Sequence, residues 1–276
     1  MSNFLLSQEY ILLDSLNNDF TVKEYTLKTR DIYSLDEEIK VYNIYVSKDA
    51  ILLMTILPNF KEKHKIYIND NYSWDKKWEK VDFENIKNQL LSNGKINMLA
   101  HEWHFENNPN KKTFKYKLVK KINGQYYASR NTLTEYFSFQ KFQYPLISSY
   151  GNLNTKESKV SIKEVRNAFM KHFPDEDFPM DFNDHRINTG LMLAKRNYLS
   201  KEFFLKGKKA YQFWTFDGWW SIDGYNEHKG IDRIVYIENE GIVGGSYDFY
   251  FSKIETEVKL WSNIINEKVM IAQELK

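Results

Sequence analysis

The stretch from Ser161 to Phe216 constrains the fold more than any other part of this chain. Ser161 and Glu164 have the spacing of a capping box, and apolar residues follow at helical spacing as far as Phe173. A proline and an acidic run then end this helix. A second helix is expected at about 184–196. The first half of the stretch therefore predicts two helices in succession.

Two strands joined by a tight basic turn come next. Leu199–Leu205 and Ala210–Phe216 read as strands, and Lys206-Gly207-Lys208-Lys209 lies between them as the turn. Arg186–Lys209 contains seven basic residues and one acid, so the small net charge of +2 conceals a concentrated basic segment. A helix that enters a DNA groove needs short polar and basic residues, and lysines on a turn can reach phosphates.

We therefore expect a nucleic-acid-binding surface in this region, with duplex DNA as the partner. The residues expected to contact it are Arg186, Asn188, Lys195, Arg196, Lys206, Lys208 and Lys209. One alternative is an ordinary helical hairpin with a solvated basic face, because Gly-Lys tips also protect sheet edges and aid solubility. Basic contacts to an acidic protein are another.

The order of elements also resembles a known family. The pattern Lys-Glu-Val … Ala-Phe … Phe … Arg-Ile … Leu … Gly-Lys-Lys-Ala-Tyr-Gln-Phe is similar to the small winged-helix domain near the C-terminus of phage and large-DNA-virus primase-helicases. The resemblance covers about residues 159–216. It implies a winged-helix-like DNA-binding module without the ATPase, because the chain has no Gly-x-x-x-x-Gly-Lys-Ser/Thr phosphate loop.

The first 150 residues predict a mixed domain with an antiparallel sheet. Helices are expected at Leu5–Leu16 and Asp82–Ser92. Strands are expected at Thr21–Thr29, Ile39–Val46, Ala50–Pro58, His64–Asn69, Lys95–Phe105, Lys112–Ile122 and Tyr126–Ser129. Asn93-Gly94 is expected to end the second helix, and Asn123-Gly124 to form a tight hairpin turn.

The small and polar stretch Ser148–Ser158 predicts a linker between two domains. The predicted domains are residues 1–150 and a winged-helix-like domain at 156–276. The second domain continues into an aromatic hairpin and a terminal helix at Ser252–Leu275, so the predicted fold class is α+β. The aromatic run Tyr211–Trp220 predicts a core strand that enters a Trp-rich turn, and a platform for stacking bases is the alternative.

Composition narrows the function classes. The chain has no cysteine, which excludes disulfides, thiolate metal ligands and a Cys nucleophile and fits a reducing cytoplasm. Its many Lys, Asn, Ile and Tyr residues are typical of a low-GC bacterium or its phage. Its N-terminus lacks the features of a signal peptide, and its apolar runs are shorter than the roughly 20 residues of a membrane helix. No membrane partner is expected.

Two further groups of residues are expected to have no catalytic or metal-binding role. His101 and His104 do not have the spacing of a zinc motif, and on the predicted strand they would point to opposite faces. Glu257-Val258-Lys259, with Asp232 or Asp248 upstream, is similar to the Asp…Glu-x-Lys pattern of metal-dependent nucleases. Its helical surroundings place the triplet on a solvated helix face.

The sequence therefore predicts a non-enzymatic DNA-binding protein, such as a replication or regulatory factor, without catalytic residues, metal or cofactor. A protein-interaction module, such as an immunity or phage counter-defence protein, is the first alternative. A cryptic metal-dependent nuclease is the second.

Overall fold

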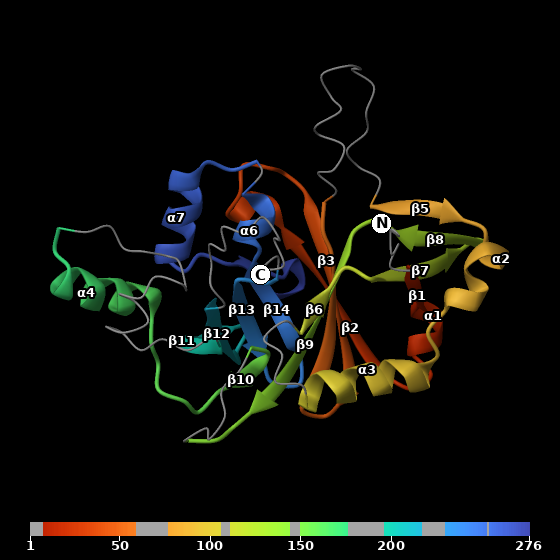
Figure 1. The fold of residues 1–276 in the computed structure, drawn as a ribbon, viewed down its shortest axis with the longest axis horizontal. Coiled ribbons are helices and arrows are strands. Elements are labelled where there is room, and N and C mark those ends of the chain that lie inside the picture. The colour runs from red at the N-terminus through yellow and green to blue at the C-terminus, as the bar shows by residue number, and fades with distance from the viewer. Residues whose placement is uncertain are drawn as a thin grey trace, which may run out of the picture.

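The computed structural model describes residues 8–58, 77–105, 111–143, 150–175, 196–216, 230–252 and 254–276. Three β-sheets follow one another along the long axis of the molecule, and helices lie at both ends (Figure 1). The protein is an α+β protein, as predicted. None of the described helices is long and apolar enough to cross a membrane.

The three sheets have mixed strand orders. The first sheet runs β1 (Glu9–Leu12), β7 (Tyr116–Ile122), β8 (Gln125–Ser129) and β5 (Trp78–Val81). The central sheet runs β10 (Asn152–Asn154), β9 (Thr132–Gln140), β4 (Ala50–Ile56), β3 (Glu38–Ser47) and β2 (Thr21–Lys28), with β6 (Lys112–Thr113) paired to β9. The third sheet runs β11 (Arg196–Leu205), β12 (Lys208–Phe216), β13 (Arg233–Ile237), β14 (Gly241–Ser246) and β15 (Met270–Ile271).

Helices lie between and around these strands. The α-helices are α1 (Leu13–Leu16), α2 (Phe83–Ile86), α3 (Asn93–Phe105), α4 (Ile162–His172), α6 (Asp248–Phe251) and α7 (Glu257–Ile265). Short 3₁₀ turns lie at Thr29–Asp31, Lys87–Gln89 and Gln273–Leu275.

The middle strands of the central sheet, β4 and β9, are buried on both faces. All seven residues of β4 are buried, which explains why this strand is almost uninterruptedly apolar. Ile51 and Leu53 pack in the cluster between the central and third sheets, whereas Leu52 and Met54 pack in the cluster on the side of the first sheet and α3. The alternation of side chains along one strand therefore supplies two cores.

The outer face of the third sheet is covered by helices. Trp214 of β12 is fully buried in a cluster with Phe169 of α4 and Ile264 of α7. The indole Nε1 of Trp214 donates a 2.7 Å hydrogen bond to the carbonyl of Val160. This contact fixes the start of α4 against β12.

Several local predictions are confirmed. α4 begins after Ser161, with both capping-box hydrogen bonds between Ser161 and Glu164. β7 and β8 form the predicted hairpin at Asn123-Gly124, where φ is 49° and 78°, the left-handed conformation that a two-residue turn requires. β11 and β12 form the other predicted hairpin.

The predicted N-terminal helix is wrong at residues 9–12. They form β1, which pairs in parallel with β7, and only residues 13–16 are helical. The reason is that Ile11 faces one buried cluster while Tyr10 and Leu12 face another, so both faces of this segment are covered.

The predicted strand at 95–105 is also wrong. This segment belongs to helix α3, which starts at Asn93, where the preceding helix was expected to end. Ile96 and Ala100 are buried four residues apart on one helical face, and Ser92 Oγ accepts a hydrogen bond from the amide of Lys95. Of the helix predicted at 82–92, only short helical turns at 83–89 form, and the side chain of Asp82 caps the first of them.

The predicted terminal helix is shorter than expected, because α7 ends at Ile265. Met270 instead adds a strand beside Gly244 and Gly245 of β14. A Cβ atom on Gly244 would lie 2.4 Å from the Met270 carbonyl, so glycine is needed for this close pairing.

The predicted linker is packed rather than exposed in its described part, residues 150–158. β10 pairs with β9, and Tyr150 and Glu157 are buried. The largest buried cluster also joins Phe137 of β9 to Phe213 of β12. The division into two domains stays a prediction, and this shared core counts against it. The strand predicted at 64–69 lies outside the described residues.

Candidate nucleic-acid interface

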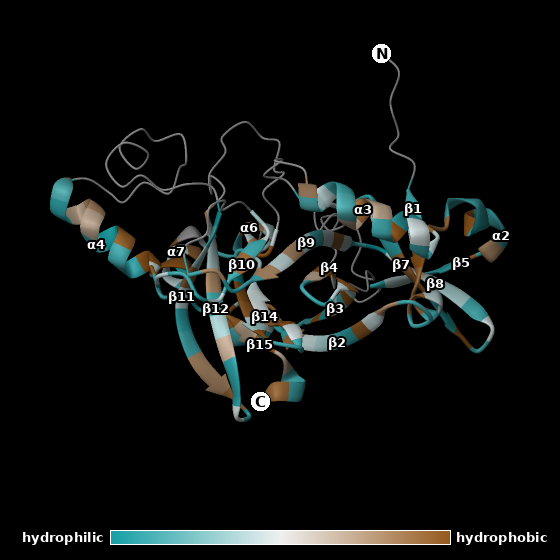
Figure 2. Ribbon diagram, turned by 90° about the horizontal axis from the view of Figure 1, so that it is seen from below, coloured by the Kyte–Doolittle hydropathy of each residue, from teal (hydrophilic) through white to brown (hydrophobic). Residues whose placement is uncertain are grey.

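The structure places four of the seven predicted contact residues. Arg196, Lys206, Lys208 and Lys209 all lie on the β11–β12 hairpin. The other three lie outside the described residues, together with the second predicted helix, and they are Arg186, Asn188 and Lys195. Figure 2 shows the hairpin extending beyond the rest of the third sheet, with a hydrophilic tip.

The tip of the hairpin is built by a two-residue turn. Lys206 and Gly207 both have positive φ, 44° and 76°, which matches the twist of the flanking strands. Lys208 and Lys209 follow on β12, so their side chains leave opposite faces of the hairpin. Lys206 donates from Nζ to the carbonyl of Glu274, at 3.0 Å.

Lys208 shares a carboxylate with a lysine of the central sheet. Glu240 Oε1 lies 2.5 Å from Lys208 Nζ, and Glu240 Oε2 lies 2.7 Å from Lys23 Nζ. The hydrogen bonds from Lys208 and Lys23 lower the pKa of Glu240 to about 2. Two lysines against one glutamate leave a net positive charge on this side of the tip.

Lys209 takes part in a second bridge of the same kind. Glu202 of β11 lies between Lys209, at 3.1 Å, and Lys159, at 2.9 Å. The hydrogen bond from Lys159 is the main cause that lowers the pKa of Glu202 below its ordinary value. Because Lys159 lies three residues before α4, this bridge connects the helix segment to the hairpin. It too carries a surplus positive charge.

Arg196 lies in a different environment. Its side chain is 18% exposed, and its guanidinium pairs with Glu157 at 2.9 Å and lies 4.3 Å from the centre of the Tyr198 ring. Glu157 also accepts the amide of Leu199 at 2.8 Å. Burial raises the pKa of Glu157 despite these bonds. Arg196 therefore anchors the beginning of β11, and less of its side chain is available for a ligand.

The structure adds residues that the sequence did not single out. Phe204 of β11 is 71% exposed and lies directly across from Lys209. Lys201 on the same strand and Lys163 on α4 are exposed as well. We call the residues around the edge strand β11 the hairpin surface, and they are Lys159, Lys163, Lys201, Phe204, Lys206, Lys208 and Lys209.

A sequence signal for Phe204 existed. Phe203 and Phe204 are adjacent in a strand, so alternation must send one of them outward. Lys159 could not be found in this way, because only the folded chain brings it to Glu202.

The aromatic run is a core strand, as predicted, where it is described. Phe213, Trp214 and Phe216 are buried, and Tyr211 is 9% exposed. Trp219 and Trp220, at the end of the same run, lie outside the described residues.

The histidine pair lies on a helix, contrary to the predicted strand. His101 and His104 are one turn apart on α3, and Nδ1 of His104 is 2.8 Å from the hydroxyl of Tyr136. Among the described residues, no group of three His, Cys, Asp or Glu side chains could hold a metal ion.

The nuclease-like triplet lies on a helix, as predicted, although α7 begins at Glu257 and not at Ser252. Val258 is 81% exposed, and Lys259 pairs with Glu255 at 3.2 Å. Asp248 is held elsewhere, by Arg233 at 2.6 Å in the buried interior. This part of the structure therefore gives no support to the nuclease alternative.

Compared with models of protein families, with curated proteins and with solved structures, the chain shows no match. The hairpin surface must therefore be interpreted from its own chemistry.

Proposed function

We propose that this chain is a non-enzymatic DNA-binding protein that contacts duplex DNA through the hairpin surface. The observation that carries the proposal is the exposed ring of Phe204 opposite Lys209. Lysines alone are explained by solubility and by protection of the edge strand. Neither reason requires the large apolar ring that is 71% exposed beside them, and a ring in this position can contact a base.

Charge supports the proposal. Each of the two glutamates at the hairpin, Glu202 and Glu240, is shared by two lysines. Lys201, Lys206 and Lys163 add further positive charge nearby. On binding, DNA phosphates would replace these carboxylates as the partners of the lysines. The cations condensed around those phosphates would then be released into solution, and this release drives sequence-independent DNA binding.

The aromatic ring supports it as well. A Phe side chain on a projecting hairpin can insert at a base step or stack on an unpaired base. The lysines around it would hold the backbone on either side. In protein–DNA interfaces, basic side chains usually contact the phosphates and position the protein, while other side chains contact the bases. The lysines and Phe204 would have these two roles here.

The resemblance to a winged helix is part of the same proposal. α4 would correspond to the first helix and the β11–β12 hairpin to the wing. β12 also pairs with β13, so the proposed wing belongs to a five-stranded sheet. Arg186, Asn188 and Lys195 would then lie on the second helix and complete the contact.

Duplex binding measured by fluorescence anisotropy tests the proposal. The variant Lys206→Glu, Lys208→Glu, Lys209→Glu should weaken binding to any sequence and should flatten the salt dependence by about two to three phosphates' worth of slope. A single-stranded oligonucleotide of the same length shows whether the duplex is preferred.

The β7–β8 hairpin offers a matched control. Lys121 lies 5.1 Å from the centre of the Tyr126 ring, as Lys209 does from the Tyr211 ring. The β7–β8 hairpin lies at the opposite end of the molecule (Figure 1). Lys121→Glu should leave DNA binding close to that of the wild type. Lys209→Glu changes the net charge by the same amount and should weaken binding. An equal loss in these two single variants would mean that net charge alone acts, and the assignment to the hairpin surface would be wrong.

A further inference from the structure

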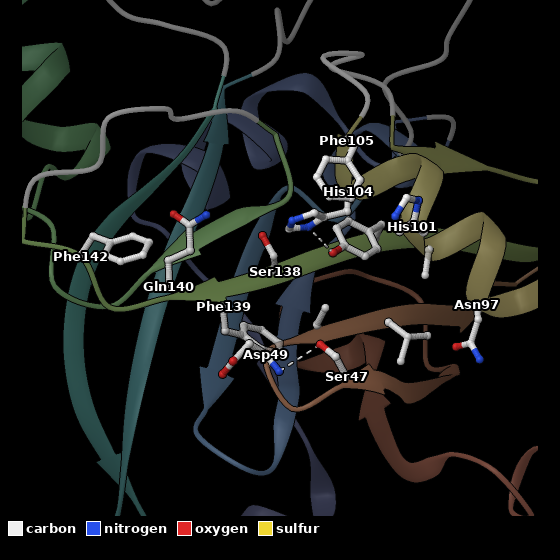
Figure 3. Close-up of a pocket in the computed structure, with 14 residues that line it drawn as sticks. Ser47, Asp49, Asn97, His101, His104, Phe105, Ser138, Phe139, Gln140 and Phe142 are labelled. Carbon is white, nitrogen blue, oxygen red and sulfur yellow. Dashed lines mark hydrogen bonds between the residues drawn. The ribbon is translucent and has the colours of Figure 1, made fainter.

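A pocket of about 540 Å³ lies between α3, the β3–β4 turn and the end of β9. Figure 3 shows Phe105 and the two histidines on the α3 side and Ser47 and Asp49 on the turn. Gln140 and Phe142 extend from the end of β9 on the remaining side. Pockets of this size are typical of sites for small molecules.

Two phenylalanine rings stand at the pocket and are turned to solvent. Phe105 is 69% exposed and Phe142 is 63% exposed. They come from different elements, one from the end of α3 and the other from the segment after β9. Exposed aromatic rings at a concave site are the surfaces on which a planar ligand can stack.

Polar groups line the same pocket. Among the described residues, the side chains of Asn97, His101 and Gln140 have no hydrogen-bonding partner. Asn97 and Gln140 each present an amide, with two donors and one acceptor oxygen. The carboxylate of Asp49 lies 3.7 Å from Lys48, a loose pair on an exposed turn. These side chains can therefore form hydrogen bonds with a planar ring whose edge carries both donors and acceptors.

The floor of the pocket is fixed. Tyr136 is 2% exposed, and its hydroxyl shares a 2.8 Å hydrogen bond with Nδ1 of His104. Burial raises the pKa of Tyr136 to about 12, so the phenol stays neutral at physiological pH. This bond orients the His104 ring beneath Phe105, whose ring centre is 4.8 Å away.

The charge of the pocket decides the class of ligand. Apart from the two imidazoles and the neutral phenol of Tyr136, Asp49 is the sole ionisable side chain among the described lining residues. The lining contains no lysine or arginine. A phosphate or carboxylate would find no cation among these lining residues, and Lys48 beside them is already paired with Asp49. The ligand should therefore be uncharged where it enters the pocket, planar, and hydrogen-bonding along its edge.

We propose that this pocket binds an uncharged nucleobase, presented as a nucleoside. The base would stack on Phe105 or Phe142, its edge would meet the amides of Gln140 and Asn97, and Asp49 would accept from a ring or exocyclic N–H group. The ribose would face solvent. This site does not depend on the hairpin surface, and either one can fail without the other.

Isothermal titration with adenosine, guanosine, cytidine and uridine tests the proposal on the full chain. At least one nucleoside should bind with a Kd on the order of 0.1 mM, as expected for a ligand of this size. Its 5′-monophosphate should bind no more tightly, because the lining residues offer the phosphate no cation. Phe105→Ala or Phe142→Ala, according to which ring the base stacks on, should weaken binding about tenfold, and full binding in both variants would contradict the proposal.

Phe114→Ala is the control, because Phe114 is another exposed phenylalanine and lies outside the pocket. It should leave nucleoside binding unchanged. Saturation-transfer NMR on the same samples reports ligand contact even if one variant changes stability. The proposal is overturned if no nucleoside binds below about 5 mM. It is overturned as well if N-acetyl-tryptophanamide binds at least as tightly as all four, which would indicate a site for aromatic peptides.

Discussion

Asn43 of β3 hydrogen-bonds both backbone groups of Ile242 in β14. Its Nδ2 donates to the Ile242 carbonyl at 2.9 Å, and its Oδ1 accepts the Ile242 amide at 2.7 Å. All four groups are buried. One side chain thus takes the place of a neighbouring strand and joins the central sheet to the third sheet.

Replacing Asn43 by Ala should destabilise the protein by about 2 to 4 kcal/mol, because two buried backbone groups lose their partners. Urea denaturation followed by circular dichroism measures the change. Asn266→Ala is the control, since Asn266 is exposed and bonds within its own helix end; it should cost less than about 0.5 kcal/mol. Similar losses for both would show that Asn43 has no special role.

The buried pair of Arg233 and Asp248 should behave as a unit. Both side chains are 1% exposed, and Asp248 also accepts from the hydroxyl of Tyr33 at 3.2 Å. Asp248→Ala alone should cost about 3 to 5 kcal/mol, because Arg233 would be left charged and unpaired in the interior. The double variant with Arg233→Met should cost less than the sum of the single variants. Strict additivity in this cycle would contradict the pairing.

Acid should weaken the bridge at the hairpin tip. The folded-state pKa of Glu240 is about 2, below its ordinary value of 4.5. A carboxyl with a lowered pKa stabilises the folded state above its unfolded pKa, and this stabilisation is lost as the pH falls toward the folded value. The free energy of unfolding should therefore decrease between about pH 5 and pH 2, with Glu240 contributing on the order of 1 kcal/mol at this surface site.

Glu240→Gln should remove that share of the pH dependence and leave the remainder unchanged. Chemical denaturation of both proteins at a series of pH values makes the comparison. An unchanged pH profile in the variant would mean that the two lysines do not hold this carboxylate.

Replacing Phe204 should affect DNA binding without affecting the stability of the fold. Because its ring is 71% exposed, Phe204→Ala should change the free energy of unfolding by less than about 0.5 kcal/mol. It should nevertheless weaken DNA binding by about 1 to 3 kcal/mol if the ring stacks on a base. Anisotropy titration and urea denaturation of the same preparation supply both numbers. Full affinity in this variant would remove Phe204 from the interface.

The sequence predicted correctly those elements whose conformation depends on a few adjacent residues. The capping box at Ser161 and the left-handed turns at Asn123-Gly124 and Lys206-Gly207 depend on a few adjacent residues, and all three form. α3 and β1 were missed because their identity depends on burial. Lys95–Phe105 has no strong local preference, and the position of Ile96 and Ala100 against the central sheet decides for a helix.

The candidate sites likewise contain some residues that the sequence indicates and others that only the fold brings together. The lysines of the turn are visible in the sequence, but Lys159 reaches them only through Glu202, 43 residues away in the chain. The pocket was missed because His101 and His104 were placed on a strand. On a helix they lie one turn apart and share a pocket with Gln140, which no short-range pattern could indicate.

The salt dependence of duplex binding by the unmodified protein tests the central claim most directly. If the hairpin surface binds phosphates, the logarithm of the association constant should fall linearly with the logarithm of salt concentration. The slope should be about −3 to −4, corresponding to three or four neutralised phosphates. No measurable affinity for duplex DNA at low salt, or an affinity that salt does not change, would contradict the account and favour a protein partner instead.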